Sequence, residues 1–235
     1  MVSKVRKLVI FFVALVVSLS IFAGYAETLT ENETENHTIL YQGHASLRIT
    51  TQEGKVIYID PYAGEGYDVP ADLILVTHGH SDHNVVKKIK TKNPDCMTIT
   101  QKEALVKGEY KTFETDFVTV EAVQAGNNKN HSIKNCVGYI LTFNDGKTVY
   151  VTGDTSTTEQ MATLAERNLD YAFFCCDGKY NMGMKEAAEC AALVQAKHSI
   201  PYHIVPGKLF NRDRAETFDV ASKLIVADGE EIVIE

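Results

Sequence analysis

The chain has 235 residues, of which 45% are hydrophobic and 23% are charged, so it is long enough to bury a substantial core. Its formal net charge of −8 argues against a nucleic-acid partner, because binding to phosphates requires an excess of basic side chains. The five cysteines contain no CxxC pair and do not indicate a disulfide framework, and we expect the adjacent Cys175 and Cys176 to fill the core instead of forming a redox pair.

The N-terminal part of the chain is typical of a targeting segment. A basic start is followed by the apolar run Leu8–Ala23, and the small residues before Glu27 suit a signal peptidase. We therefore expect residues 1–26 to be a signal peptide, residues 27–37 to be a polar spacer, and the protein to be exported. A retained membrane anchor is the alternative, although the run is shorter than the roughly 20 residues that span a bilayer. Only that alternative would bring the protein into contact with a membrane.

Residues 38–235 are predicted to form one domain, because neither a linker nor a repeat divides them. Short runs rich in β-branched residues predict four strands in the first half: Thr38–Tyr41, Ser46–Thr50, Lys55–Ile59 and Leu73–Val76. A capping box over Thr100–Glu103 then predicts a short helix that ends at Gly108.

The second half mixes strands with helices. The expected strands are Phe117–Val123, Val137–Phe143, Thr148–Val151, Tyr171–Cys176, Pro201–Val205 and Glu231–Ile234. The expected helices are Ser156–Arg167, which a second capping box would open, Met184–Lys197 and Ala215–Ile225. This order favours two β-sheets packed together with helices outside them.

A dense group of potential metal ligands follows the strand that ends at Val76. Three imidazoles and one carboxylate, from His78, His80, Asp82 and His83, lie within six positions. A loop at a strand end allows such side chains to converge on one point, and imidazole with carboxylate is a ligand set for zinc, manganese and iron. The motif therefore predicts a metal site. The alternative is an exposed His-rich loop that has no function.

Two more residues of the ligand type occur in comparable places. Asp154 follows the expected strand Thr148–Val151, and His203 lies within the expected strand Pro201–Val205. Taken alone, Asp154 would be a helix cap and His203 a satisfied buried histidine. Beside the first motif, we expect both to be metal ligands.

The motif His-x-His-x-Asp-His after a strand, the later Gly153-Asp154 and the final His203 resemble the metallo-β-lactamase superfamily. More narrowly, the chain resembles the branch with ascorbate-6-phosphate lactonase-like and N-acyl-phosphatidylethanolamine phospholipase D-like proteins. That likeness extends in order over about Leu40–His203. It rests on Gly43-His44, Ile59-Asp60-Pro61, Val76-Thr77-His78, Gly138-Tyr139, Val149–Thr155, Glu186-Ala187-Ala188 and Ile200–His203.

The resemblance implies an α/β fold, a four-layer αββα sandwich, with two divalent metal ions at one edge of the β layers. Zinc is the expected metal, with manganese and iron as alternatives. A hydroxide shared by the two ions would attack the substrate. The implied ligands are His78 and His80 for one ion, Asp82, His83 and His203 for the other, and Asp154 as the bridge. Asp82 and Asp154 are thereby the carboxylates expected to act in catalysis.

The loop Gln124–Lys134 departs from the family pattern at the third ligand of the first ion. His131 is the only imidazole in this loop, and we expect it to complete that ligand set. Asn127 is the alternative, because relatives in this branch sometimes have asparagine there. His44 and Asp60 are expected to orient metal ligands from behind. The alternatives are an ordinary polar histidine and a turn aspartate.

The implied reaction is hydrolysis of a small-molecule ester, lactone or phosphodiester. An acid at Asp154 favours these substrates over β-lactams, since true β-lactamases usually lack an acid there. Lys179 and Tyr180 are placed to bind an anionic group of the substrate, or else are a solvated lysine and a packed tyrosine. The alternative function is a non-catalytic metal-binding or sensing protein on the same fold, against which the intact ligand set argues.

Overall fold

The computed structural model describes residues 36–235, which belong to one compact unit. The predicted signal peptide and most of the predicted spacer lie outside the described residues. Within residues 36–235 there is no helix that combines the length and the hydropathy needed to cross a bilayer.

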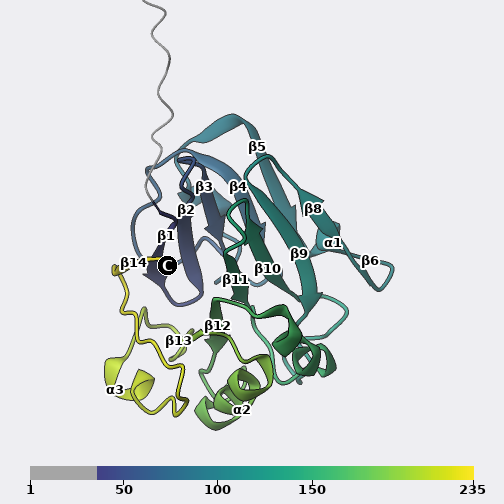
Figure 1. The fold of residues 1–235 in the computed structure, drawn as a ribbon, viewed down its shortest axis with the longest axis vertical. Helices are drawn as coiled ribbons and strands as arrows, with labels where there is room; N and C mark the ends of the chain where they lie inside the picture. The colour runs from purple at the N-terminus through teal and green to yellow at the C-terminus, as the bar shows by residue number, and fades with distance from the viewer. Residues whose placement is uncertain (1–35) are drawn as a thin grey trace, which may run out of the picture. The chain divides into compact units, whose positions relative to one another are not determined.

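Six strands form the first sheet, in the order β14-β1-β2-β3-β4-β5. Each strand from β14 through β1 and β2 to β3 is antiparallel to the next, whereas β4 runs parallel to both β3 and β5. The C-terminal strand pairs with β1, so the two ends of the described chain meet in one sheet (Figure 1). The bounds are β1 (Thr38–Gly43), β2 (Ser46–Thr50), β3 (Val56–Ile59), β4 (Ala71–Val76), β5 (Lys92–Thr100) and β14 (Glu231–Val233).

The second sheet also has six strands, in the order β13-β12-β11-β10-β9-β8. Its strands β8 to β11 are antiparallel, and β11, β12 and β13 run parallel to one another. The bounds are β8 (Thr112–Glu114), β9 (Val118–Gln124), β10 (Val137–Phe143), β11 (Thr148–Val151), β12 (Tyr171–Cys175) and β13 (His198–Tyr202). A separate small hairpin consists of β6 (Leu105–Val106) and β7 (Glu109–Tyr110).

Short helices lie outside the sheets. The longer ones contact the second sheet: α2 packs against β12 and against η2, which itself contacts β9 (Figure 1). The helix bounds are η1 (Val86–Lys88), α1 (Gln101–Ala104), η2 (Glu159–Arg167), α2 (Met184–Val194) and α3 (Arg212–Ala215).

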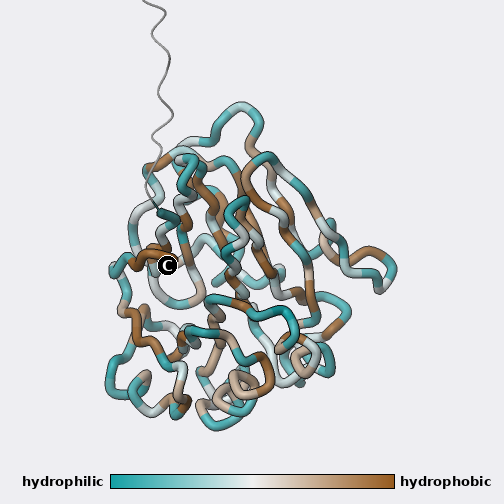
Figure 2. The backbone as a smooth tube through the Cα atoms, in the orientation of Figure 1, coloured by the Kyte–Doolittle hydropathy of each residue, from teal (hydrophilic) through white to brown (hydrophobic). Residues whose placement is uncertain are grey.

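Strand β4 shows how the first sheet is buried on both faces. Leu73 and Leu75 belong to the main core cluster between the sheets, whereas Ile74 and Val76 belong to a second cluster on the outer face. Because successive side chains of a strand point to opposite faces, a continuous apolar run marks a strand that is covered on both sides. The outer cluster is covered by the loops around η1, with Ile89 packed into it. Figure 2 shows these apolar strand segments and the polar loops around them.

These layers confirm the predicted mixed α/β class and the two packed sheets with helices outside. The strands Ser46–Thr50, Val137–Phe143 and Thr148–Val151 have the predicted bounds. All five cysteines are free thiols, and all except Cys96 are buried, which confirms the prediction that Cys175 and Cys176 fill the core. The edge strand β5 was not predicted, because most of its residues are exposed and give no apolar alternation.

The predicted helix Ala215–Ile225 is wrong. Helix α3 ends at Ala215, and the chain then runs beside β13, where Leu224 donates a backbone hydrogen bond to the carbonyl of Ser199 at 2.9 Å. The backbone groups are thus satisfied by the sheet instead of by a helix. The last predicted strand of that sheet is also shifted, because β13 pairs with β12 from His198 and ends before His203.

Of the two predicted capping boxes, only the first is formed. The Thr100 hydroxyl and the Glu103 carboxylate cap α1 as predicted. The helix ends at Ala104, because β6 begins at the next residue, so the predicted end at Gly108 is wrong. The box at Ser156 is absent, since the backbone N–H of Ser156 is bonded to the Gly126 carbonyl at 2.7 Å. The segment that follows is the 3-10 helix η2, which starts at Glu159.

Asp170 joins β11 to the start of β12 through a buried carboxylate. Its Oδ2 accepts hydrogen bonds from the N–H and the hydroxyl of Thr148 at 2.8 and 3.1 Å, and Lys197 donates to Oδ1 at 2.6 Å. Burial alone would raise the pKa of Asp170, but the bonds from Lys197 and Thr148 lower it. An ionised carboxylate therefore stabilises the fold above the ordinary aspartate pKa, and this contribution is lost as the pH falls through the lowered pKa.

We therefore expect Asp170→Asn to lower the free energy of unfolding at pH 7 by about 1–3 kcal/mol. The difference from the unsubstituted protein should shrink below about pH 4, where the carboxyl begins to be protonated in the unfolded chain. Denaturant unfolding at both pH values measures this. Asp219→Asn is the matched control, because Asp219 is exposed. Equal stability of both variants at pH 7 would contradict the expectation.

Candidate metal centre

Backbone hydrogen bonds join the two sheets at one edge. The N–H of Val137 donates to the carbonyl of Thr77 at 3.0 Å, and the N–H of His203 donates to the carbonyl of His44 at 2.7 Å. Gly153 lies in the same junction with φ 63°, where an added Cβ would approach the Val137 carbonyl oxygen to 2.8 Å. Only glycine allows this close approach without displacement. The ends of strands from both sheets are thereby held together at one edge.

Parallel pairing explains which residues meet at this edge. Asp60 follows β3 and the His78–His83 loop follows β4, and these two strands are parallel. In the other sheet, Asp154, Asp177 and His203 follow β11, β12 and β13, which are also parallel. Because the carboxyl ends of parallel strands lie on the same edge of a sheet, all of these residues point to one region.

Asp60 organises the histidine loop from behind. Its Oδ1 accepts the N–H of Thr77 at 2.7 Å, and its Oδ2 accepts the Thr77 hydroxyl at 2.6 Å and Nδ1–H of His83 at 2.8 Å. Since the Thr77 hydroxyl proton goes to Asp60, its oxygen is left to accept Nδ1–H of His78, at 3.1 Å. One buried carboxylate thus fixes both His78 and His83 with Nε2 free to bind a metal ion.

The loop with His131 folds back on itself beside the site. Gly126 has φ 95°, and an added Cβ would lie 2.8 Å from the backbone of Ser132. His131 Nε2 lies 3.2 Å from Nδ1 of His80 and 3.3 Å from Oδ2 of Asp154. The Asn127 amide donates instead to the Thr157 carbonyl at 2.6 Å. The structure therefore brings His131 to the predicted site and directs the amide of Asn127 away from it.

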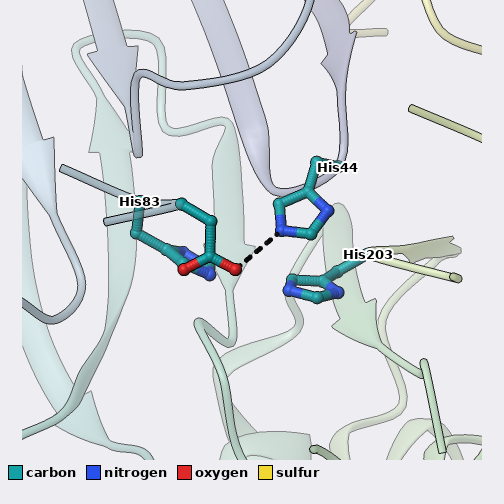
Figure 3. A group of neighbouring side chains, drawn as sticks. His44, His83 and His203 are labelled. Carbon is teal, nitrogen blue, oxygen red and sulfur yellow. Dashed lines mark hydrogen bonds and ion pairs between the residues drawn. The ribbon is translucent and has the colours of Figure 1, made fainter. Parts of the chain in front are cut away.

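His44 lies among the candidate ligands and not behind them (Figure 3). Its Nε2 is 3.3 Å from Oδ2 of Asp82, and its ring centroid is 3.7 Å from that of His203. The side chains of His44, Asp82, His83 and His203 offer one ligand atom each within 4.8 Å of one another. The sequence predicted His44 only as a residue that orients ligands. The structure places it where it contacts Asp82 directly.

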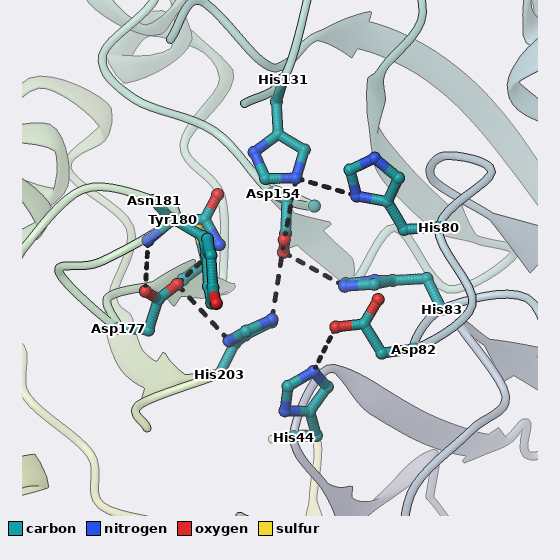
Figure 4. Close-up of polar contacts among 12 residues, drawn as sticks. His44, His80, Asp82, His83, His131, Asp154, Asp177, Tyr180, Asn181 and His203 are labelled. Atoms are coloured by element: carbon teal, nitrogen blue, oxygen red, sulfur yellow. Dashed lines mark hydrogen bonds and ion pairs between the residues drawn. The ribbon is translucent and has the colours of Figure 1, made fainter. Parts of the chain in front are cut away.

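Asp154 stands at the centre of the remaining candidate ligands (Figure 4). Two further groups have ligand atoms within 4.8 Å of one another: His78, His80 and His131, and His78, His83 and Asp154. The nearest imidazole nitrogens to the Asp154 carboxylate are those of His131 at 3.3 Å, His83 at 3.4 Å, His203 at 3.6 Å and His78 at 4.0 Å. Four of the other six predicted ligand residues therefore face this one carboxylate, whereas His80 and Asp82 belong to ligand groups that share His78 or His83 with it.

The donor atoms fit divalent metal ions. Nε2 of His78, of His83 and of His203 are buried, and none has a hydrogen-bond partner among the described residues. Leaving buried polar atoms unpaired is costly, so such atoms indicate a partner of another kind. Behind the third of them, Nδ1 of His203 lies 3.6 Å from the carboxylate of Asp177. Imidazoles backed by carboxylates are typical of zinc sites.

The protonation states also suit a cation. Burial and the nearby His83 lower the pKa of His78 to about 2, so this imidazole is neutral. Burial would raise the pKa of Asp154, but His203 and His83 hold it well below its ordinary range. His83 is the exception: burial would lower its pKa, but Asp154 and Asp60 raise it well above the usual value. This shift favours the imidazolium form of His83, whose extra proton would be released on binding of an ion.

Asp177 is a site residue that the sequence interpretation did not select. Its carboxylate is buried, and Oδ1 accepts the N–H groups of Lys179 and Tyr180, both at 2.7 Å. The signal that was available is its position within three residues of the end of an apolar strand, which it shares with Asp60 and Asp154. Of the two residues predicted to bind substrate, Tyr180 lines a pocket of about 530 Å³ over the metal cluster, and Lys179 does not.

Residues 38–203 match the family model of the β-lactamase superfamily domain. A UPF0173 metal-dependent hydrolase from Anoxybacillus flavithermus is 31% identical over 70% of this chain and 84% of its own length. A UPF0173 metal-dependent hydrolase from Pyrococcus furiosus is 30% identical over 70% of this chain and 83% of its own length. The crystal structure of a Parabacteroides distasonis protein, proposed to be a metal-dependent hydrolase, is similar with a TM-score of 0.66. It is 29% identical, and the match covers 83% of this chain and 94% of that one.

The metal content of two variants tests whether His131 or Asn127 is a metal ligand. We expect His131→Ala to lose about one metal ion per chain, because the imidazole beside His80 is a strong ligand for a borderline metal. Asn127→Ala should keep its full metal content, since its amide is bonded to Thr157. Elemental analysis after dialysis measures the content, and circular dichroism checks the fold. Full content in His131→Ala with a loss in Asn127→Ala would contradict the assignment.

Proposed function

Because this chain belongs to the metallo-β-lactamase superfamily and is a metal-dependent hydrolase, we propose that it uses two zinc ions to hydrolyse a small ester, lactone or phosphodiester. The observation that carries this proposal is the convergence of buried, unpartnered imidazole nitrogens on the carboxylate of Asp154. Two divalent ions at such a site lower the pKa of a shared water and polarise the scissile group.

We assign the ligands by their neighbours. One ion would be held by His78, His80 and His131, whose ligand atoms form one group. The other would be held by the group of His44, Asp82, His83 and His203, or by a subset of it. Asp154 would bridge the two ions, because its carboxylate faces imidazoles of both groups. Carboxylate and neutral imidazole are the ligand forms that such ions require.

Two buried acids would keep this site in its reactive arrangement. Asp60 holds Nδ1–H of His83 directly and that of His78 through Thr77. Asp177 lies behind His203, with its carboxylate 3.6 Å from Nδ1, an ion-pair distance longer than a hydrogen bond. Such partners fix the ring orientation and the tautomer, so that Nε2 presents its lone pair to the ion.

Substitution of Asp154, assayed together with the unsubstituted protein, distinguishes a hydrolase from a metal-binding protein without turnover. We expect Asp154→Ala to lose at least one of the two ions and to reduce hydrolysis by on the order of a hundredfold or more, because a bridging carboxylate offsets the repulsion between the ions. The assay uses zinc-loaded protein with nitrophenyl phosphodiester, lactone, thioester and β-lactam substrates, and Asp219→Asn as the control. If the unsubstituted protein binds zinc but turns over none of these substrates, the result supports the non-catalytic alternative instead.

We also propose that the hydrolase is exported, on the basis of the basic start and the apolar run Leu8–Ala23. N-terminal sequencing of extracytoplasmic material should give a mature chain that begins near Glu27, and the domain should be released in soluble form. An intact Met1 in membrane-bound material would replace cleavage with a retained anchor. Recovery of the protein only from the cytoplasm would contradict export altogether.

A further inference from the structure

Two exposed aromatic rings border the pocket over the metal cluster. Besides candidate ligands, the pocket is lined by four residues: Tyr62, Ser81, Asn130 and Tyr180. The two tyrosines come from different sheets, since Tyr62 follows β3 and Tyr180 follows β12. Their side chains are 37% and 43% exposed, although large apolar groups are usually buried. Among residues 36–235, they are the only aromatic residues that line the pocket outside the ligand set.

The loop that carries Tyr180 is tightly held. Asp177 accepts the backbone N–H of Tyr180 at 2.7 Å, and the Asn130 amide donates to the Tyr180 carbonyl at 2.9 Å. The ammonium group of Lys179 lies 4.8 Å from the ring centroid and covers one face of the ring. Figure 4 shows Tyr180 on the Asp177 side of the site, across from His80 and His83.

Tyr62 is fixed in a comparable way. Its N–H donates to the Ser46 hydroxyl at 3.1 Å, and its carbonyl accepts from Lys88 at 2.9 Å. The ring stands edge-on to His44, with 5.4 Å between centroids. Ordered aromatic side chains bind apolar groups with a small loss of conformational entropy, because they have few rotatable bonds. Both tyrosines therefore provide prepared apolar surface beside the reaction site.

The wall of the pocket has no lysine or arginine to bind an anionic group of the substrate beside the metal cluster. Among the described residues that line it, Asp82 and Asp154 are carboxylates and none is a basic lysine or arginine. Recognition of phosphate or carboxylate groups usually relies on arginine or lysine side chains. The ammonium group of Lys179 is instead engaged with the Tyr180 ring.

We infer that Tyr62 and Tyr180 are specificity-determining residues that bind the apolar tail of an uncharged ester or lactone at this site. This inference rests on the proposed hydrolase function and selects one class among its substrates. The scissile carbonyl would lie over the metal cluster, and the tail would lie along the tyrosine rings at the pocket opening. A phosphodiester substrate is the competing outcome.

The test compares two lactones that differ only in their tails. Zinc-loaded protein is assayed with γ-butyrolactone, with a γ-lactone that carries a hexyl tail, and with bis(p-nitrophenyl) phosphate. We expect the tailed lactone to be preferred over γ-butyrolactone by about tenfold or more in kcat/KM, mainly through KM. Tyr62→Ala and Tyr180→Ala should each reduce this preference severalfold. Tyr62→Phe and Tyr180→Phe should retain most of the preference, because the ring supplies the contact.

Leu193→Ala is the matched control, since Leu193 is 38% exposed and does not line this pocket. Three outcomes would overturn the inference: equal use of both lactones, an unchanged preference in both alanine variants, or phosphodiester as the best substrate. Each of them would still be compatible with the proposed hydrolase function. Failure to hydrolyse any of the three would count against the proposed function. In that case calorimetry with the corresponding hexyl γ-lactam still tests whether the two tyrosines bind the tail. Weaker binding to the alanine variants supports the inference, and equal or absent binding overturns it.

Discussion

The buried carboxylate of Asp154 is the constraint on which the site depends. An ionised carboxylate inside a protein is stable only when opposite charges or hydrogen-bond donors surround it. Here the surrounding groups are imidazoles from both halves of the chain, with His78 and His83 after β4 and His131 and His203 from the second sheet, and Oδ1 of Asp154 has no hydrogen-bond partner among the described residues. The two sheets must therefore meet at this edge for the charge to be tolerated, and metal ions would complete the compensation.

Three residues at this edge adopt a backbone conformation that is unfavourable in free energy. His44, Asp60 and His203 have φ values of 54°, 46° and 47°, in the left-handed region that non-glycine residues rarely adopt. Each such residue costs on the order of 1–3 kcal/mol, and the conformation persists only where the surroundings enforce it. The backbone bond from His203 to His44 and the three bonds accepted by Asp60 provide that enforcement.

A division of roles follows from the same architecture. The ligands and the acids behind them sit at strand ends, where the rigid sheets define their positions, as expected for a site that must hold its geometry. The groups that would contact substrate, Tyr62 and Tyr180, are carried by loops, which the Ser46 hydroxyl and the Asp177 carboxylate respectively help to order. Loops of this kind can change in sequence without disturbing the metal ligands, which is how one fold accommodates different substrates.

The sequence by itself determined the features that depend on neighbouring residues. The apolar strands, the histidine motif after Val76 and the candidate ligands Asp154 and His203 all follow from local pattern, and the structure gathers them at one edge. Only the tertiary structure decided the rest, because it depends on contacts between distant residues. Asp177 is recognised by its approach to His203, His44 by its contact with Asp82, and the segment after Ala215 by its pairing with β13. No local periodicity encodes such contacts, so the sequence pattern around these residues allowed a loop aspartate, a polar histidine and a helix.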